Sequence, residues 1–355
     1  MKLAIAAGGT GGHLFPGIAV VEFLQDLGES EGLFIGSDRE LEEQILKKEN
    51  IRHVVLKVGR IKGENMLGRL RTFLTLPAMT WRARRVLADF GPQMVLGIGG
   101  YSSGPVILAA LSLGIPRAIL EPNAIPGLTN RLLGHFVQRI FVAFREAERF
   151  FPARKVRLTG TPVRKKLSDL RAVSSSHFTL LVLGGSQGAH SINQAVVNAL
   201  PLLEKSGKSL SVIHQTGMND FRWVQEVYRA SLVPHEVHPF IKEMDQAYAR
   251  ADLIISRAGA STLAELQATC IPSLLIPYPF AADDHQRFNA LHLVKAGGAE
   301  MIPDAELTGE FLAQRMLHFE ADRNLLREMK NNLEKLGGRK AAERVASECY
   351  ELANV

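Results

Sequence analysis

The chain has 355 residues, of which 46% are hydrophobic and 22% charged. This length is too great for one core and suits two domains of about 100–200 residues each, with the composition of an ordinary soluble globular protein. The formal net charge of +6 favours an anionic partner, and composition leaves open nucleic acid, a phosphorylated substrate and an acidic membrane face.

The two cysteines, Cys270 and Cys349, lie far apart and form no CxxC pair. This spacing excludes a thiolate metal site and indicates reduced, structural thiols in a cytoplasmic protein. The chain begins with a charged residue and an apolar strand. It lacks the long apolar core and small-residue cleavage site of a secretory signal, so we expect it to stay in the cytoplasm.

Short apolar segments alternate with helical patterns along the chain. The first segment, Lys2–Ala7, breaks into the glycine loop GGTGGH at 8–13, and Pro16 then opens a helical pattern over residues 18–27. Such alternation predicts α/β domains with parallel, doubly wound sheets covered by helices on both faces. The further strands that we expect are residues 32–35, 94–98, 117–120, 139–144, 179–183, 211–215, 236–240, 253–256 and 273–277.

Residues 94–115 are long and uncharged enough to imitate a transmembrane helix, since about 18 apolar residues can span a bilayer. Glycines and a proline interrupt this segment, in the sequence GGYSSGP at 99–105. We therefore interpret it as a strand, a loop and a buried helix.

The unit of strand, glycine loop and helix occurs again in the middle of the chain. The apolar residues 178–183 break into GGSQG at 184–188, and a helical pattern follows over residues 191–202. Each loop alone is compatible with a simple tight turn. However, a strand that runs through glycines into a helix N-terminus presents free N–H groups to phosphate. Two such units predict two nucleotide-fold halves that face one cleft.

A linker is expected at GTPVR, residues 160–164, before the polar serines at 174–176. This divides the chain into an N-terminal domain, residues 1–160, and a second domain, residues 161–337. The C-terminal pattern at about 338–355 is helical. Its apolar side, formed by Ala341, Val345, Cys349 and Leu352, is suited to packing back on the first domain.

The glycine loops do not fit the common dinucleotide and ATP motifs. The dinucleotide fingerprint requires GxGxxG, but GTG at 9–11 is followed three residues later by Leu14, and GIG at 97–99 by Ser102. No Gly-Lys-Ser/Thr closes any of the loops, which excludes the Walker motif.

Four motifs together resemble those of glycosyltransferase family 28, the peptidoglycan glycosyltransferases. They are GGTGGHxxP at 8–16, GGYSSGP at 99–105, GTPVR at 160–164 and GGSQGA at 184–189, and the similarity continues to at least residue 290. The resemblance implies the GT-B fold, with two doubly wound Rossmann-like domains facing a central cleft. It further implies inverting transfer from UDP-GlcNAc to the 4-hydroxyl of the muramyl sugar in lipid I, giving lipid II, without metal or cofactor.

The same resemblance implies a setting and partners. The first domain would take the lipid I acceptor and face an anionic membrane surface, and the second would bind UDP-GlcNAc. The enzyme would lie peripherally on the cytoplasmic face of the inner membrane, beside other cell-wall synthesis proteins, and would bind no nucleic acid.

The resemblance also implies the residues of the donor and acceptor sites. Tyr101 and Ser102 would bind the acceptor. The residues that would bind UDP-GlcNAc are Thr10, Gly11, Gly12, Asn123, Arg164, Ser186, Ile241, Ala260, Ser261, Thr262, Leu263, Ala264, Glu265 and Gln286.

Several of these positions have an individual role in the family pattern. Glu265 would accept the ribose hydroxyls, although an acid in the first turn of a helix is also explained by the helix dipole. Arg164 and Ser186 would bind the diphosphate. The backbone of Ile241 would meet the uracil edge, while its side chain is equally suited to a core.

The sequence departs from the family pattern at two places. His285 stands where a glutamine is usual, although Gln286 is retained as a sugar-binding residue. In LEPN at 120–123 the family usually shows HEQN, so only Glu121 and Asn123 are kept. The adjacent acids Asp283 and Asp284 are interpreted as helix caps in preference to metal ligands.

His13 is the first candidate for the catalytic base. Inverting transfer requires a base, stabilisation of the leaving UDP and positioning of the acceptor hydroxyl. A neutral imidazole with a pKa of about 6.5 accepts a proton at cytoplasmic pH. Because His13 lies near a helix N-terminus, a second role, donation to an acceptor phosphate, also stays open. Glycine loops and Arg164 would stabilise the charge on UDP.

A basic and apolar segment offers a membrane surface. Residues 66–85 mix bulky apolar residues with arginines and contain no acid, which is typical of a helix at an anionic interface. A core helix with a basic solvent face explains the composition equally well. The membrane-contact candidates are Lys62, Arg69, Arg71, Phe73, Leu74 and Trp81.

Two alternatives share the expected fold. A UDP-GlcNAc 2-epimerase-like enzyme would need several acids and bases around the sugar, whereas this chain offers glycine loops and a basic-apolar segment. A noncatalytic sugar-nucleotide-binding protein would bind UDP without turnover, and the retention of His13, Arg164 and Glu265 argues against it.

Overall fold

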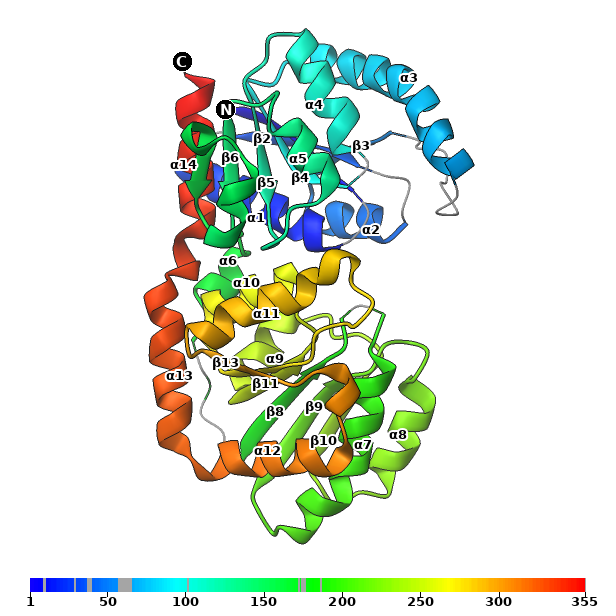
Figure 1. Ribbon diagram of the computed structural model, residues 1–355, viewed down its shortest axis with the longest axis vertical. Coiled ribbons are helices and arrows are strands. Elements are labelled where there is room, and N and C mark those ends of the chain that lie inside the picture. Colours follow the sequence, from blue (N-terminus) through cyan, green and yellow to red (C-terminus); the bar gives the residue numbers. More distant parts are fainter. Residues whose placement is uncertain are drawn as a thin grey trace. The chain divides into compact units, whose positions relative to one another are not determined.

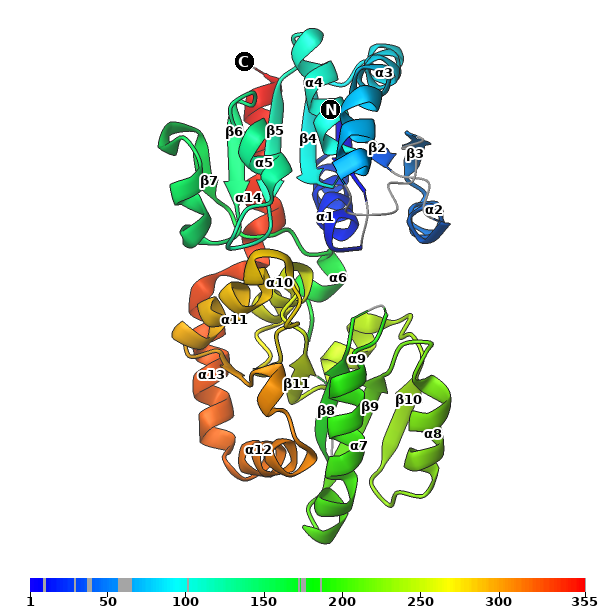
Figure 2. The ribbon, with the colours of Figure 1, turned by 45° about the vertical axis from the view of Figure 1, so that its right-hand side comes forward.

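The computed structural model describes residues 1–8, 11–28, 30–36, 40–56, 66–100, 102–171, 173, 177–185 and 187–354, without the side chains of residues 11, 40, 41, 48 and 66–74. The chain forms two compact units. The first consists of Met1–Lys165 and Lys340–Val355, and the second of Lys166–Arg339. Figures 1 and 2 show the elements of each unit.

The first unit contains a seven-stranded parallel sheet in the order β3-β2-β1-β4-β5-β6-β7. Its strands are β1 (Lys2–Ala7), β2 (Glu31–Gly36), β3 (Arg52–Val55), β4 (Met94–Gly99), β5 (Arg117–Glu121), β6 (Arg139–Val142) and β7 (Val156–Leu158). Its helices are α1 (Gly11–Leu27), α2 (Glu40–Lys48), α3 (Met66–Phe90), α4 (Ser103–Ser112), α5 (Leu128–Leu133), α14 (Ala341–Ala353) and the short η1 (Arg145–Phe150) and η2 (Ala153–Lys155), with α6 (Lys165–Ser168) at the boundary of the units.

Strand β1 is apolar and buried from Leu3 to Ala7 because helices cover both faces of the sheet (Figure 1). Leu3 and Ile5 belong to the core that contains residues of α1 and α14. The intervening Ala4 and Ala6 belong to the core on the other face, which contains residues of α3, α4 and α5. This period of two places a separate core on each side of the sheet.

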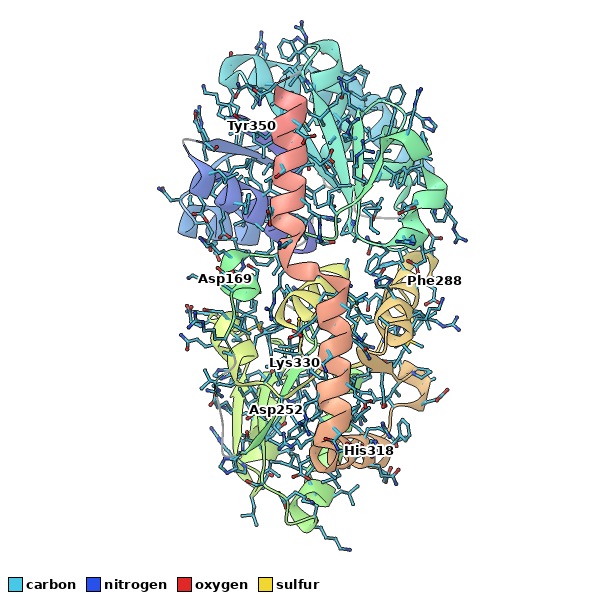
Figure 3. All side chains as sticks on the ribbon, turned by 90° about the vertical axis from the view of Figure 1, so that its left-hand side faces the viewer. Asp169, Asp252, Phe288, His318, Lys330 and Tyr350 are labelled. Atoms are coloured by element: carbon cyan, nitrogen blue, oxygen red, sulfur yellow. The ribbon has the colours of Figure 1, made fainter. Side chains whose placement is uncertain are left out.

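The last helix, α14, is part of the first unit. Val345, Ala346 and Cys349 are buried in the same core as the α1 side chains. Glu348 on α14 forms ion pairs with Arg139 at 3.4 Å and Arg157 at 3.3 Å. Figure 3 faces this helix, with the labelled Tyr350 on its solvent side.

The second unit contains a six-stranded parallel sheet in the order β10-β9-β8-β11-β12-β13. Its strands are β8 (Phe178–Leu183), β9 (Leu210–Gln215), β10 (His235–His238), β11 (Leu253–Ser256), β12 (Ser273–Leu275) and β13 (Ala299–Met301). Its helices are α7 (His190–Lys205), α8 (Phe221–Arg229), α9 (Met244–Arg250), α10 (Ala260–Thr269), α11 (His285–Lys295), α12 (Gly309–Ala321) and α13 (Arg323–Leu336), with the short η3 (Ala282–Asp284), η4 (Asp304–Glu306) and, next to the boundary with the first unit, η5 (Gly338–Lys340).

Both sheets follow the Rossmann order, in which the chain winds outward in two directions from a central pair of strands. The predicted α/β class, with two doubly wound parallel sheets, is confirmed. The central pairs are β1 with β4 and β8 with β11. In such sheets ligands bind beyond the carboxyl ends of these strands, and this edge is where the glycine loops lie.

The apolar segment at 94–115 is resolved as the sequence predicted. Strand β4 ends at Gly99, and α4 begins at Ser103. Across the described parts of the chain, no helix has the length and apolar character that a membrane span requires.

Candidate functional site

The first glycine loops meet at the carboxyl ends of β1 and β4. Gly100 has a φ of 79°, and a Cβ atom there would lie 2.0 Å from the carbonyl oxygen of Gly8. Only glycine allows two main chains to approach this closely. Thr10 and Tyr101, both predicted site residues, lie outside the described residues.

Ser103, which sequence reasoning did not select, joins the same two strand ends. Its hydroxyl lies 2.8 Å from the carbonyl oxygens of Ala6 and Gly99 and accepts a hydrogen bond from the Gly99 N–H at 3.0 Å. The neighbouring Ser102 is buried, and its Oγ has no hydrogen-bond partner among the described residues. A buried hydroxyl without a partner fits its predicted role in binding the acceptor, which stays a prediction.

His13 lies in the first turn of α1, two residues after Gly11 and one after Gly12, and its ring faces Gly99. A Cβ atom on Gly99 would lie 3.1 Å from His13 Cε1. Burial lowers the pKa of His13, against a hydrogen bond to the main chain of Ile98 and the negative charge of Glu42. The imidazole is therefore neutral near pH 7. Its Nδ1 is buried and has no partner within the described part of the chain.

Asn123 is held by Glu121, a buried carboxylate to which the sequence analysis assigns no role. Glu121 Oε1 accepts from the main-chain N–H and Nδ2 of Asn123 at 3.0 and 3.1 Å. Its Oε2 accepts from Gly127 N at 3.2 Å and Asn130 Nδ2 at 2.9 Å. Burial raises the pKa of Glu121 although these donors oppose it. An acid at the end of an apolar strand was the available signal.

Arg164 belongs to the first unit in the structure. Its guanidinium carbon lies 4.6 Å from the centre of the Phe15 ring on α1, a cation–π contact. The next residue, Lys165, forms an ion pair with Asp26 at 2.5 Å. These contacts hold Arg164 against the helix that carries His13.

In the second unit, the loop after β8 lies against the end of β9. A Cβ atom on Gly188 would lie 2.1 Å from the carbonyl oxygen of Thr216, so this position also requires glycine. Ser186, the predicted diphosphate donor of this loop, lies outside the described residues.

Ile241 is buried, and its main-chain N–H already has a partner. It donates to Oε1 of Gln215 at 2.8 Å. Gln215 Nε2 donates in turn to the carbonyl oxygen of Gly185 at 3.0 Å. Gln215 therefore links two predicted donor-binding segments. Sequence reasoning missed it, although a glutamine at the end of an apolar strand was a signal.

The segment Ala260 to Glu265 forms the beginning of α10. The first N–H groups of a helix have no acceptor within it, which suits them to an anion. Leu263 and Ala264 are buried, so their side chains pack in the interior. Ser261 and Thr262 are partly exposed. Glu265 is the sixth residue of α10, which removes the first-turn explanation, and its Oε2 accepts from the Tyr248 hydroxyl at 2.8 Å.

Gln286, the second residue of α11, supports two neighbouring segments of the main chain. Its Oε1 accepts from Ala258 N at 3.2 Å and Tyr278 N at 3.0 Å, which ties α11 to the segment before α10. His285, which replaces the usual glutamine of the family, forms a hydrogen bond between its Nδ1 and the Ala282 carbonyl oxygen at 2.7 Å.

The cap role expected for Asp283 and Asp284 is wrong. Both residues have a φ near +50°, at 52° and 51°. An N-cap side chain reaches the helix N–H groups from an extended backbone, and these residues are left-handed. Asp284 forms no cap hydrogen bond and instead pairs with Arg287 at 3.5 Å. Across the described residues, no group of three or more His, Cys, Asp or Glu side chains is arranged to hold a metal ion.

Arg257, in the segment SRAGASTLAE at 256–265, has a structural role. Arg257 donates to the carbonyl oxygens of Ile276 and Pro277, each at 3.2 Å, and pairs with Asp304. It also donates to the Ser191 hydroxyl at 2.8 Å. Its hydrogen bonds join the residue after β11 to the segment after β12 and to the N-terminal turn of α7.

Most side chains of the membrane-contact candidates lie outside the part that the structure describes. Lys62 lies outside the described residues, and for Arg69, Arg71, Phe73 and Leu74 only the main chain in α3 is described. Trp81 on the same helix is 53% exposed, and the Arg85 guanidinium carbon lies 3.8 Å from the centre of its ring.

Comparison with known proteins gives matches over both units. Residues 3–142 match the glycosyltransferase family 28 N-terminal domain, and residues 179–345 match the glycosyltransferase family 28 C-terminal domain. A relative from Myxococcus xanthus is 46% identical over 356 residues, covering 99% of this chain and 93% of its own length. Its name is UDP-N-acetylglucosamine–N-acetylmuramyl-(pentapeptide) pyrophosphoryl-undecaprenol N-acetylglucosamine transferase.

Solved structures agree at the level of the fold. MurG from Acinetobacter baumannii has a TM-score of 0.77 and 31% identity, covering 99% of this chain and 100% of that chain. A UDP-GlcNAc 2-epimerase from Neisseria meningitidis has a TM-score of 0.67 at 16% identity, covering 99% and 100%. The second likeness shows a shared fold and nothing about activity.

Replacing Gly100 by alanine should destabilise the first unit by at least about 2 kcal/mol, because the new Cβ meets the Gly8 carbonyl in a strained backbone. The matched control is Gly104→Ala, where no heavy atom lies within 4 Å of the added carbon. Urea unfolding should place this control within about 1 kcal/mol of the wild type. Equal stability of the two variants would contradict the close approach.

Proposed function

The chain belongs to glycosyltransferase family 28, and from this membership we propose that it transfers N-acetylglucosamine from UDP-GlcNAc to lipid I, giving lipid II. It is an N-acetylglucosaminyltransferase of peptidoglycan synthesis. The observation that carries this conclusion is 46% identity to a transferase of this name over 99% of the chain. The donor and acceptor follow from the printed name of that relative and the peptidoglycan family motifs.

The proposed reaction is a direct displacement. The 4-hydroxyl oxygen of the muramyl sugar attacks the anomeric carbon of N-acetylglucosamine, and the bond from that carbon to UDP breaks. The hydroxyl proton passes to His13, whose neutral ring and whose Nδ1, without a partner among the described residues, suit a general base. Inversion follows because the hydroxyl attacks from the face opposite UDP.

The donor is proposed to bind mainly through main-chain groups. The first turn of α10 offers N–H groups to the diphosphate, together with Arg164 and the loop that contains Ser186. Glu265, whose Oε2 accepts from the Tyr248 hydroxyl, is assigned to the ribose hydroxyls because a carboxylate accepts more than one hydrogen bond. Gln286 and Asn123 are assigned to the sugar.

The test is incubation of the protein with labelled UDP-GlcNAc and a short-chain lipid I analogue in detergent with EDTA. Label should enter the lipid fraction only when the acceptor is present, and at the same rate with or without EDTA. Release of UDP or conversion of the sugar without labelled lipid would instead support the epimerase-like reaction, and binding without turnover a noncatalytic role.

The pH profile of transfer separates the two roles of His13. A base must be neutral, so kcat/KM should stay level from pH 8 downward and fall only below the pKa of His13, which burial places under its ordinary value of about 6.5. His13→Gln should lower kcat by about 10²–10⁴-fold and remove this fall. If His13 serves as a charged phosphate ligand, kcat/KM rises through the same range as pH decreases.

We also propose peripheral attachment to an anionic membrane surface, where the lipid acceptor resides. Besides Trp81 and Arg85 on α3, a cavity of about 510 Å³ supports it. Among the described residues that line this cavity none is acidic, and they include Arg117, Arg154, Lys155 and the half-exposed Phe136. Burial, with the charges of Arg154 and Arg117, lowers the pKa of Lys155, as expected where cations crowd without counter-ions.

Replacing Arg154 and Lys155 together by glutamine should weaken binding to phosphatidylcholine vesicles that contain phosphatidylglycerol by roughly 30-fold, since each basic residue contributes about 1 kcal/mol. Vesicle sedimentation measures the effect. The control variant, Arg222→Gln with Arg229→Gln on α8, changes the net charge equally at exposed positions of the other unit. If both variants lose the same vesicle affinity, the effect comes from net charge alone, and the proposed membrane contact at Arg154 and Lys155 is wrong.

A further inference from the structure

Gln215 is a buried amide that bridges two separate segments of the second unit. It is the last residue of β9 and is 3% exposed. Its Oε1 accepts from Ile241 N at 2.8 Å, just beyond β10, and its Nε2 donates to the Gly185 carbonyl oxygen at 3.0 Å, just beyond β8. The clamp uses one donor and one acceptor of a single side chain, which together join the two segments.

The main chain around the clamp is closely packed. Gly188 lies directly against the Thr216 carbonyl, and a Cβ atom on Gly217 would lie 2.4 Å from the Gln187 carbonyl oxygen. Thr216 N donates to the His238 carbonyl oxygen at 3.0 Å, which ties the end of β9 to β10. A shift of the β8 loop is therefore transmitted through residues 215–217 to the segment that carries Ile241.

We propose that Gln215 is a positioning residue that couples recognition of the nucleobase to binding of the diphosphate. This inference rests on the proposed function, in which the backbone of Ile241 meets the uracil edge and the loop after β8 meets the diphosphate. Neither contact is made by Gln215 itself. Its amide sets the relative position of the two segments that make them.

The clamp also determines which base the site favours. Because Gln215 occupies the N–H of Ile241, the main-chain carbonyl is the group of this residue that remains for a base edge. A carbonyl accepts a hydrogen bond. Uracil carries a hydrogen on N3 and supplies the donor, whereas N3 of cytosine is an acceptor and meets the carbonyl with a lone pair. The clamped site therefore selects uracil over cytosine.

Gln215→Glu is the sharpest test because the two side chains have the same shape. When protonated, the carboxyl retains one donor and one acceptor, as the amide does. When ionised, it only accepts, so the Gly185 carbonyl loses its donor. Burial favours the neutral form, so protonation at mildly acidic pH should restore the clamp.

The measurement is the affinity for UDP, CDP and UMP by isothermal titration calorimetry at about pH 5.5 and pH 8. In Gln215→Glu at the higher pH, both the preference for UDP over CDP and the gain from the second phosphate should fall about tenfold or more. Both should return at the lower pH. Gln215→Met, which is similar in size and cannot hydrogen-bond in this way, should lose both at either pH.

Neighbouring groups that titrate are controlled by the wild type at the same two pH values. His238 on β10 is partly buried and pairs with the exposed Glu236 at 3.7 Å. Burial lowers the pKa of His214 on β9 to about 3, so it stays neutral throughout. Gln187→Glu adds the same charge to the same loop, from an exposed position, and should weaken UDP and CDP equally.

The outcomes are distinct. If the wild type binds UDP but the folded Gln215→Glu variant keeps its preference for UDP over CDP at pH 8, the clamp is wrong and the proposed function stands. If the preference is lost equally at both pH values in Gln215→Glu, hydrogen bonding by residue 215 is not the cause and the proposal fails. If the wild type binds no UDP, the proposed function itself fails and the clamp with it.

Discussion

The close approach of main chains beyond the carboxyl ends of neighbouring strands is the constraint on which the sites depend. At Gly100 and at Gly188 a Cβ atom would lie 2.0 and 2.1 Å from a carbonyl oxygen of the neighbouring loop. Because no side chains separate the loops there, their amide groups and helix N-termini come together at one edge of each sheet. His13 and the Gln215 clamp take their positions from these contacts.

The fold could be predicted where strands are buried on both faces. β1 after Lys2 and β8 apart from Thr179 are apolar and buried, and both are followed by glycines, so the sequence predicts them clearly. Three strands were missed for a physical reason. β3, β7 and β13 are edge strands of three or four residues that are partly exposed, so they lack the apolar pattern of the equally short but fully buried β12.

For the candidate site, the sequence predicts positions and leaves the contacts that hold them unpredicted. The family motifs indicate Ile241 and Asn123, but the residues that hold them, Gln215 and Glu121, act through the direction of single hydrogen bonds. Such directions depend on tertiary packing and leave no periodic signal. The wrong prediction of helix caps has the same cause. Aspartate is a residue type that favours a cap, but the left-handed backbone at Asp284 prevents one, and the sequence does not show that conformation.

The position of α14 has a consequence for biosynthesis. The first unit completes its core with Val345, Ala346 and Cys349, which a ribosome adds only after the whole of the second unit. During translation the second unit, Lys166–Arg339, is therefore whole before the first, although it begins later in the chain. Until α14 is synthesised, the apolar side of α1 that it covers stays exposed. Nascent chains stalled before residue 340 should therefore expose an apolar surface of the kind that chaperones bind.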